Sequence, residues 1–150
     1  MGKKNIKKIA IQPSKEVVKP PAAKELLKPI FLFDCIDKDG PYAFDLDKSY
    51  FDHKDFLEKM INYSCMTWNE IRRQQHDYAK SKHHYIGSEE ISKEAQKRLK
   101  VKNLWDFSED LFSFAFNNKL RIIGLKESDG FHVLWYDVNH EVCPSRKKHT

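Results

Sequence analysis

The sequence predicts an α+β domain with an N-terminal β-hairpin, two to three helices, and a C-terminal antiparallel meander that forms one sheet with the helices on one face. Residues 111–137 contain three short apolar segments separated by polar turns, which is typical of a meander. Residues 53–100 instead repeat apolar side chains at helical spacing. The 150 residues are 40% apolar and 33% charged. A chain of this length buries a core without disulfides or a structural metal, so residues 30–150 are predicted to be one domain.

Residues 1–29 differ from the rest in composition and predict a flexible basic arm. They contain eight lysines against two glutamates, four prolines and no aromatic residue. Such a segment cannot bury enough surface to offset its ordering entropy. The arm is either a solubilising tail or a segment that attracts phosphate. Residues 30–145 hold 16 basic and 20 acidic residues, so the overall charge of +5 comes from the ends of the chain.

The first half of the domain predicts a hairpin followed by two helices. The apolar run 30–36 is followed by turn residues at 37–41 and by a second apolar run at 42–46, which favours a β-hairpin. Asp52 is placed to cap a helix that begins at about residue 53. Thr67 and Glu70 have the spacing of a capping box and predict the start of a second helix.

A third helix and the meander complete the prediction. Ser88 precedes two glutamates and is expected to cap this helix, in which Ile91, Ala95 and Leu99 repeat every four residues. Strands are predicted at 111–116, 120–125 and 131–137. The last strand is apolar at both parities, as expected for burial on both faces.

Candidate catalytic residues gather near the chain's end. Asp137 and His140 are three residues apart, so the carboxylate could orient the imidazole for general acid–base chemistry near neutral pH. The alternative is a His–Asp pair that only holds the turn after the last strand. A metal site that adds Cys143 is the weaker interpretation, because zinc sites usually show two close ligand pairs. No metal and no cofactor is therefore predicted, and His132 is a further catalytic candidate.

A second group of residues mixes basic, imidazole and aromatic side chains, a combination that suits single-stranded RNA. Phosphates attract cations, and unpaired bases stack on aromatic faces. A solvated helix face is the alternative interpretation. The predicted nucleic-acid-binding residues are Arg72, Arg73, His76, Lys82, His84, Tyr85, Trp135, Lys147 and Lys148.

Arg121 interrupts an otherwise apolar strand between Leu120 and Ile122. Its guanidinium could clamp a phosphate, or it could pair with a carboxylate across the meander. No nucleotide-binding loop, serine-hydrolase motif or zinc-protease motif is present. The three cysteines form no CxxC pair, and no segment has the length and apolarity of a membrane span or signal peptide. We therefore expect a cytoplasmic protein without a membrane partner.

Part of the chain resembles a group of small, mostly uncharacterised microbial proteins. The resemblance spans residues 55–150, and its closing motif is Trp-x-Asp-x-x-His from Trp135 to His140, followed by Pro144. The segments that carry it are 66–71, 82–84, 111–114, 120–124 and 131–145. The order of helices followed by a meander also resembles toxins of the RelE/ParE type. The basic arm and the length of the chain depart from those toxins.

The resemblance implies a toxin of a toxin–antitoxin system that cleaves RNA, ribosome-bound mRNA included, and is held in check by an antitoxin protein. On this hypothesis the protein is a metal-independent endoribonuclease, in which His140 moves the proton and Arg121 or the C-terminal lysines stabilise the phosphorane. The alternative hypothesis is a non-catalytic module that binds nucleic acid or protein.

Overall fold

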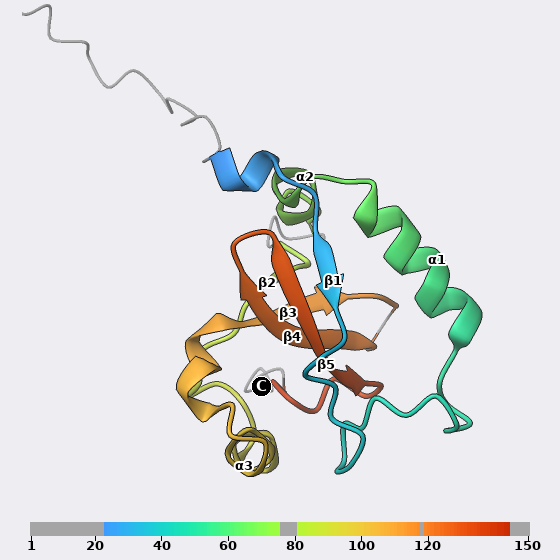
Figure 1. Ribbon diagram of the computed structural model, residues 1–150. Helices are drawn as coiled ribbons and strands as arrows, with labels where there is room; N and C mark the ends of the chain where they lie inside the picture. Colours follow the sequence, from blue (N-terminus) through green and yellow to red (C-terminus); the bar gives the residue numbers. More distant parts are fainter. Residues whose placement is uncertain (1–22, 76–80, 118, 145–150) are drawn as a thin grey trace, which may run out of the picture.

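The computed structural model describes residues 23–75, 81–117 and 119–144 (Figure 1). Most of the predicted basic arm and the candidates His76, Lys147 and Lys148 lie outside the described residues. No helix in the described ranges is both long and apolar enough to cross a membrane. The elements are η1 (Ala23–Leu26), β1 (Ile30–Leu32), α1 (His53–Ser64), α2 (Trp68–Arg72), β2 (His84–Tyr85), α3 (Lys93–Val101), η2 (Trp105–Asp110), β3 (Leu111–Ala115), β4 (Arg121–Glu127) and β5 (Gly130–Asp137).

The strands form one mixed sheet in the order β1-β5-β4-β3-β2. Strands β3, β4 and β5 are the predicted antiparallel meander. Strand β2 extends it by antiparallel pairing with β3, and β1 lies in parallel beside β5 at the opposite edge. The α+β class with a single sheet is therefore confirmed.

The predicted N-terminal hairpin is wrong. The chain does turn at 37–41, where Gly40 has a φ of 83°, but residues 42–46 form no strand and β1 pairs with β5 instead. The first residue of this turn, Asp37, points into the protein, where its buried carboxylate accepts hydrogen bonds from Arg98 and Trp135. The Tyr42 carbonyl then accepts a hydrogen bond from the Tyr136 amide, so this segment crosses to the far end of β5.

The prediction that the helices cover one face of the sheet is also wrong, because both faces are covered (Figure 1). Helices α1 and α2 pack on Phe112, Phe114, Phe131 and Val133 of one face. Helix α3 packs on the other face, against a cluster that includes Leu111, Ile123, Leu134 and Trp135. Burial of β5 on both faces, which its sequence predicts, requires this second layer.

The helix caps follow local sequence rules at two of three positions. Asp52 caps α1, and Thr67 forms a capping box with Glu70 at α2, as predicted. The predicted cap of α3 is wrong, because Ser92 rather than Ser88 accepts the amide of Ala95. Residues 88–90 form a turn, and the Ser92 amide donates to the Val142 carbonyl, which fixes the helix start four residues later.

A β-bulge between Ile123 and Gly124 shifts the register of β4 against β5. A Cβ atom at Gly124 would lie 2.1 Å from the His132 carbonyl oxygen, so only glycine lets the two backbones approach this closely.

Candidate functional site

A polar cleft of about 660 Å³ lies between α1, the segment after α2 and the turn between β3 and β4. Three lysine and arginine side chains and four amide side chains line this cleft, and none of the described lining residues is a carboxylate. We name it the basic cleft. Its lining is Lys59, Asn62, Tyr63, Met66, Gln74, Gln75, Lys82, Ala115, Phe116, Asn117 and Arg121.

The wall contributed by α1 follows from helical spacing. Lys59, Asn62 and Tyr63 follow one another at three- and four-residue intervals from Lys59, which places them on one face of the helix, and Met66 lies just after the helix ends. The phenol of Tyr63 donates a hydrogen bond of 2.9 Å to the Ala115 carbonyl, which ties α1 to the end of β3. Burial raises the pKa of Tyr63 to about 12, so the phenol stays protonated and keeps this bond at neutral pH.

The wall of the basic cleft opposite α1 includes Gln74 and Lys82, and the fully buried His83 fixes their positions. Its Nδ1 accepts the amide of Ala115, so this nitrogen carries no proton. Its Nε2 is then the donor to the Gln74 side-chain oxygen, at 2.8 Å. The neutral imidazole thus fixes Gln74 and, through the backbone, the neighbouring Lys82 at the rim of the cleft.

Arg121 connects the basic cleft with the end of the last strand. It begins β4, where it is in register with Ala115 on one side and Asp137 on the other. Burial lowers its pKa and the nearby Asp137 raises it, but a guanidinium remains charged in proteins. Its positive charge partly opposes the rise in the pKa of Tyr63 and contributes, after burial, to the lowered pKa of His140.

The predicted hydrogen bond between Asp137 and His140 is not present among the described residues. Both oxygens of the buried Asp137 accept backbone amides instead, from Glu141 and Val142 at 2.9 Å each. Burial raises the pKa of Asp137, and these two bonds oppose that shift. Asp137 therefore stabilises the turn after β5 through backbone amides, and not through the pair with His140 on which both predicted interpretations depend.

His140 sits in this turn with a left-handed backbone, at a φ of 58°. Burial and the charge of Arg121 lower the pKa of His140, although the Asp137 carboxylate opposes them. The imidazole is therefore mainly neutral at pH 7 and able to accept a proton. The structure brings Arg121, Asp137 and His140 to one end of β5.

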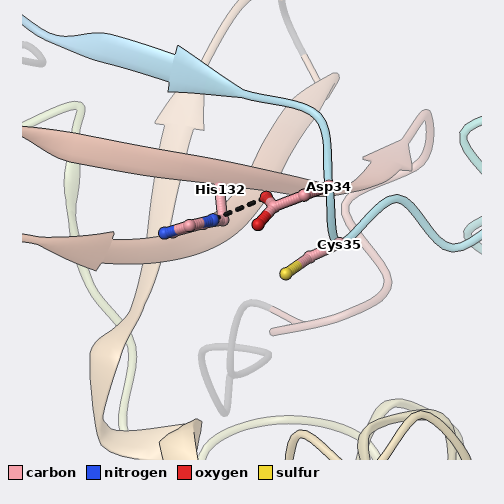
Figure 2. Close-up of side chains that lie close together, drawn as sticks. All are labelled: Asp34, Cys35 and His132. Carbon is pink, nitrogen blue, oxygen red and sulfur yellow. Dashed lines mark hydrogen bonds and ion pairs between the residues drawn. The ribbon is translucent and has the colours of Figure 1, made fainter.

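His132 lies near the other end of β5, apart from these three residues. Five residues separate it from Asp137, a span of roughly 16 Å along an extended strand. Its Nδ1 hydrogen-bonds the Asp34 carboxylate at 2.6 Å, and Cys35 lies beside them (Figure 2). Among the described residues this is the group that could hold a metal ion, and the set Asp137, His140 and Cys143 does not form one.

The predicted nucleic-acid residues are divided by their exposure. Arg72, Arg73, His84 and Tyr85 are exposed, with the Arg72 guanidinium 5.9 Å from the centre of the Tyr85 ring. Trp135 is fully buried and donates its indole N–H to Asp37, so the prediction that it contacts nucleic acid is wrong. The sequence predicted both that this strand is buried on its two faces and that Trp135 contacts nucleic acid, and the structure decides for burial.

Sequence reasoning missed the contribution of α1 to the basic cleft. Lys59 and Asn62 are ordinary polar residues of an amphipathic helix, and only the intervals of three residues from Lys59 to Asn62 and four from Lys59 to Tyr63 mark a shared face. Their approach to Lys82 and Arg121 depends on the packing of α1 against the sheet.

No protein-family model matches this chain, and no curated protein or solved structure matches it at a significant level. The resemblance to RelE/ParE toxins therefore stays a prediction. A fold does not by itself define a function, whereas the residues of a site can indicate its chemistry.

Proposed function

We propose that the protein binds RNA and holds a backbone phosphate in the basic cleft. The observation that supports this proposal is the lining of the cleft, in which Lys59, Lys82 and Arg121 are the charged residues among those described. A phosphate is attracted by such cations, and a guanidinium can bond two of its oxygens at once. The amides supply donors for the sugar or a neighbouring phosphate.

Exposed groups beside the cleft favour a single-stranded ligand. Tyr85 is 41% exposed and belongs to the edge strand β2. Its ring offers a stacking surface for an unpaired base, with Arg72 close to it. Lys82 precedes this strand by two residues, so phosphate and base contacts would be adjacent along one RNA segment.

Endoribonuclease activity is the more specific proposal. It is favoured by the position of Arg121, whose charge acts on His140. Attack of a ribose 2′-hydroxyl on phosphorus needs a base that accepts its proton and a cation that stabilises the negative charge on the phosphorane oxygens. The P–O5′ bond then breaks, and the leaving 5′-oxygen takes the proton back from the imidazolium or from water. The lowered pKa of His140 supplies a neutral base, and Arg121 supplies the cation. In this proposal the base acts without donating a hydrogen bond to Asp137, and no metal ion takes part.

Binding is tested by fluorescence anisotropy with a labelled single-stranded RNA over a series of salt concentrations. Lys59→Ala and Lys82→Ala should each weaken binding and reduce the slope of log K against log salt by about 0.7, the value for one lost phosphate contact on a single strand. Lys93→Ala removes an exposed lysine at the start of α3 and is the matched control. Unchanged binding in the double variant Lys59→Ala/Lys82→Ala would contradict the cleft as the RNA site.

Cleavage is tested separately with end-labelled RNA in the presence of a chelator. His140→Ala should retain RNA affinity and lose cleavage, whereas Arg121→Gln should lose both. If the wild-type protein binds RNA without cutting it, the protein is a binding module and the nuclease proposal fails. Salt-insensitive binding would instead point to contacts other than phosphate.

A further inference from the structure

Three different metal-ligating side chains meet at the edge of the sheet away from the basic cleft. One ligand atom from each of Asp34, Cys35 and His132 lies within 4.8 Å of the other two. Figure 2 shows the Nδ1 edge of the His132 ring turned toward Asp34, with the Cys35 thiol on the same side. We propose that this group binds a divalent transition-metal ion, with zinc the preferred ion.

The fold holds this group together through the parallel pairing of β1 with β5. Leu32 is in register with His132, so the residues that leave β1 pass directly beside the imidazole. The Asp37 amide donates to the Leu134 carbonyl, so the segment is tied to β5 again two residues beyond Cys35. Asp34 and Cys35 are thereby held between two backbone attachments to the strand that carries His132.

The spacing of the ligand atoms suits a tetrahedral ion after a small adjustment. Zinc bonds of 2.0–2.3 Å place neighbouring ligand atoms about 3.3–3.8 Å apart. Asp34 Oδ1 and His132 Nδ1 are hydrogen-bonded at 2.6 Å, so the two atoms must move apart for an ion to bind both. The Cys35 thiol loses its proton to solvent when its sulfur binds. Asp34 is 62% exposed at its side chain and has room to move.

The chemical types of the three ligands, Asp34, Cys35 and His132, favour some metal ions over others. A thiolate, an imidazole and one carboxylate are typical of zinc and disfavour magnesium and calcium, which prefer oxygen ligands. Cys35 and His132 also line a cleft of about 210 Å³ with Asp110 and Glu127. This cleft gives the ion a path to the site and space for a water or a fourth ligand.

The test uses the full, reduced, metal-free chain and titrates zinc in competition with a chromophoric chelator. We expect one ion per chain in this site. Cys35→Ser and His132→Gln should each weaken zinc binding by roughly 100-fold or more, since loss of even an outer-shell partner costs 10–100-fold. Cys65→Ser removes an exposed thiol outside the group and should bind as the wild type does.

Cobalt gives a second readout. Co²⁺ in the wild-type protein should show a thiolate charge-transfer absorption that Cys35→Ser abolishes and Cys65→Ser retains.

Asp34→Asn replaces an exposed carboxylate with an amide of the same size, so it should weaken the affinity for the ion without unfolding the chain. Zinc should raise the unfolding midpoint of the wild type but not that of Cys35→Ser. Failure of the wild type to bind zinc, or binding by Cys35→Ser and His132→Gln as tight as that of the wild type, would overturn the proposal. Neither result bears on RNA binding, which uses the basic cleft.

Discussion

Asp37 links three distant parts of the chain through one buried carboxylate. It accepts two hydrogen bonds from the Arg98 guanidinium, at 2.8 and 3.0 Å, and one of 3.0 Å from the Trp135 indole. The Asp39 amide donates a further bond. Burial raises the pKa of Asp37, but these hydrogen bonds outweigh burial and hold it below the usual value of 3.8. The residue therefore joins α3 to β5 as an ionised group.

Asp37→Asn should lower the free energy of unfolding by about 2–3 kcal/mol, because it leaves the half-buried Arg98 charge without its partner. Because the folded pKa is depressed, the contribution of Asp37 is fully present above pH 3.8 and is lost as the pH falls through the lower folded value. The stability gap between wild type and variant should therefore narrow below about pH 4. Urea unfolding of both proteins at several pH values measures this difference in the free energy of unfolding.

The exposed Asp39→Asn is the matched control, since the Asp39 carboxylate acts on Arg98 through its charge while its backbone amide, which bonds Asp37, is kept in the variant. It should change stability by less than about 0.5 kcal/mol. An equal loss in both variants would show that the buried ion pair with Arg98 contributes nothing measurable.

At the scale of elements, helix starts depend on which polar residue meets the first free amides. Ser92 accepts the amide of Ala95 at 3.1 Å and also hydrogen-bonds the Tyr42 hydroxyl at 2.8 Å. Ser88 precedes two acidic residues and has the better local signal, yet it caps nothing in the structure. The attachment of Ser92 to Val142 decides between the two serines.

Ser92→Ala should destabilise the protein by about 1–2 kcal/mol, because an amide of the first turn of α3 loses its acceptor and Tyr42 loses a partner. Ser88→Ala is the control and should cost less than about 0.5 kcal/mol. Thermal unfolding of both variants measures the difference. A larger loss from Ser88→Ala would restore the start of the helix that the sequence predicts.

At the scale of the whole molecule, one sheet carries both hydrophobic clusters. Ile71 of α2 is fully buried against one face, and Leu99 of α3 is fully buried against the other. Strand β5 contributes side chains to both clusters. Loss of either layer exposes the shared strands, so the two clusters should unfold together.

Leu99→Ala and Ile71→Ala should each lower the free energy of unfolding by about 2–5 kcal/mol. Each variant should show a single transition, with the same midpoint by far-UV circular dichroism and by tryptophan fluorescence. Fluorescence reports on both layers, since Trp68 lies in one cluster and Trp135 in the other. Separate midpoints in Leu99→Ala would show that the α3 layer unfolds independently.

Both functional proposals depend on placements at this largest scale. The basic cleft requires α1 to pack against the meander, which brings Lys59 to Arg121. The metal group joins Asp34 and His132, which are 98 residues apart in the sequence. No spacing rule connects either pair. The sequence therefore indicated Lys82 and Arg121 as phosphate-binding candidates without Lys59, and His132 as a catalytic candidate without Asp34.

The sequence by itself determined the features that depend on neighbours within a few residues. The caps at Asp52 and Thr67, the three strands of the meander and the burial of β5 on both faces all follow from local hydrogen bonding and side-chain period. Only the tertiary structure decided the parallel pairing of β1, the second helical face and the burial of Trp135. These depend on which distant surfaces compete to bury apolar area and to satisfy Asp37, and that competition involves the whole chain.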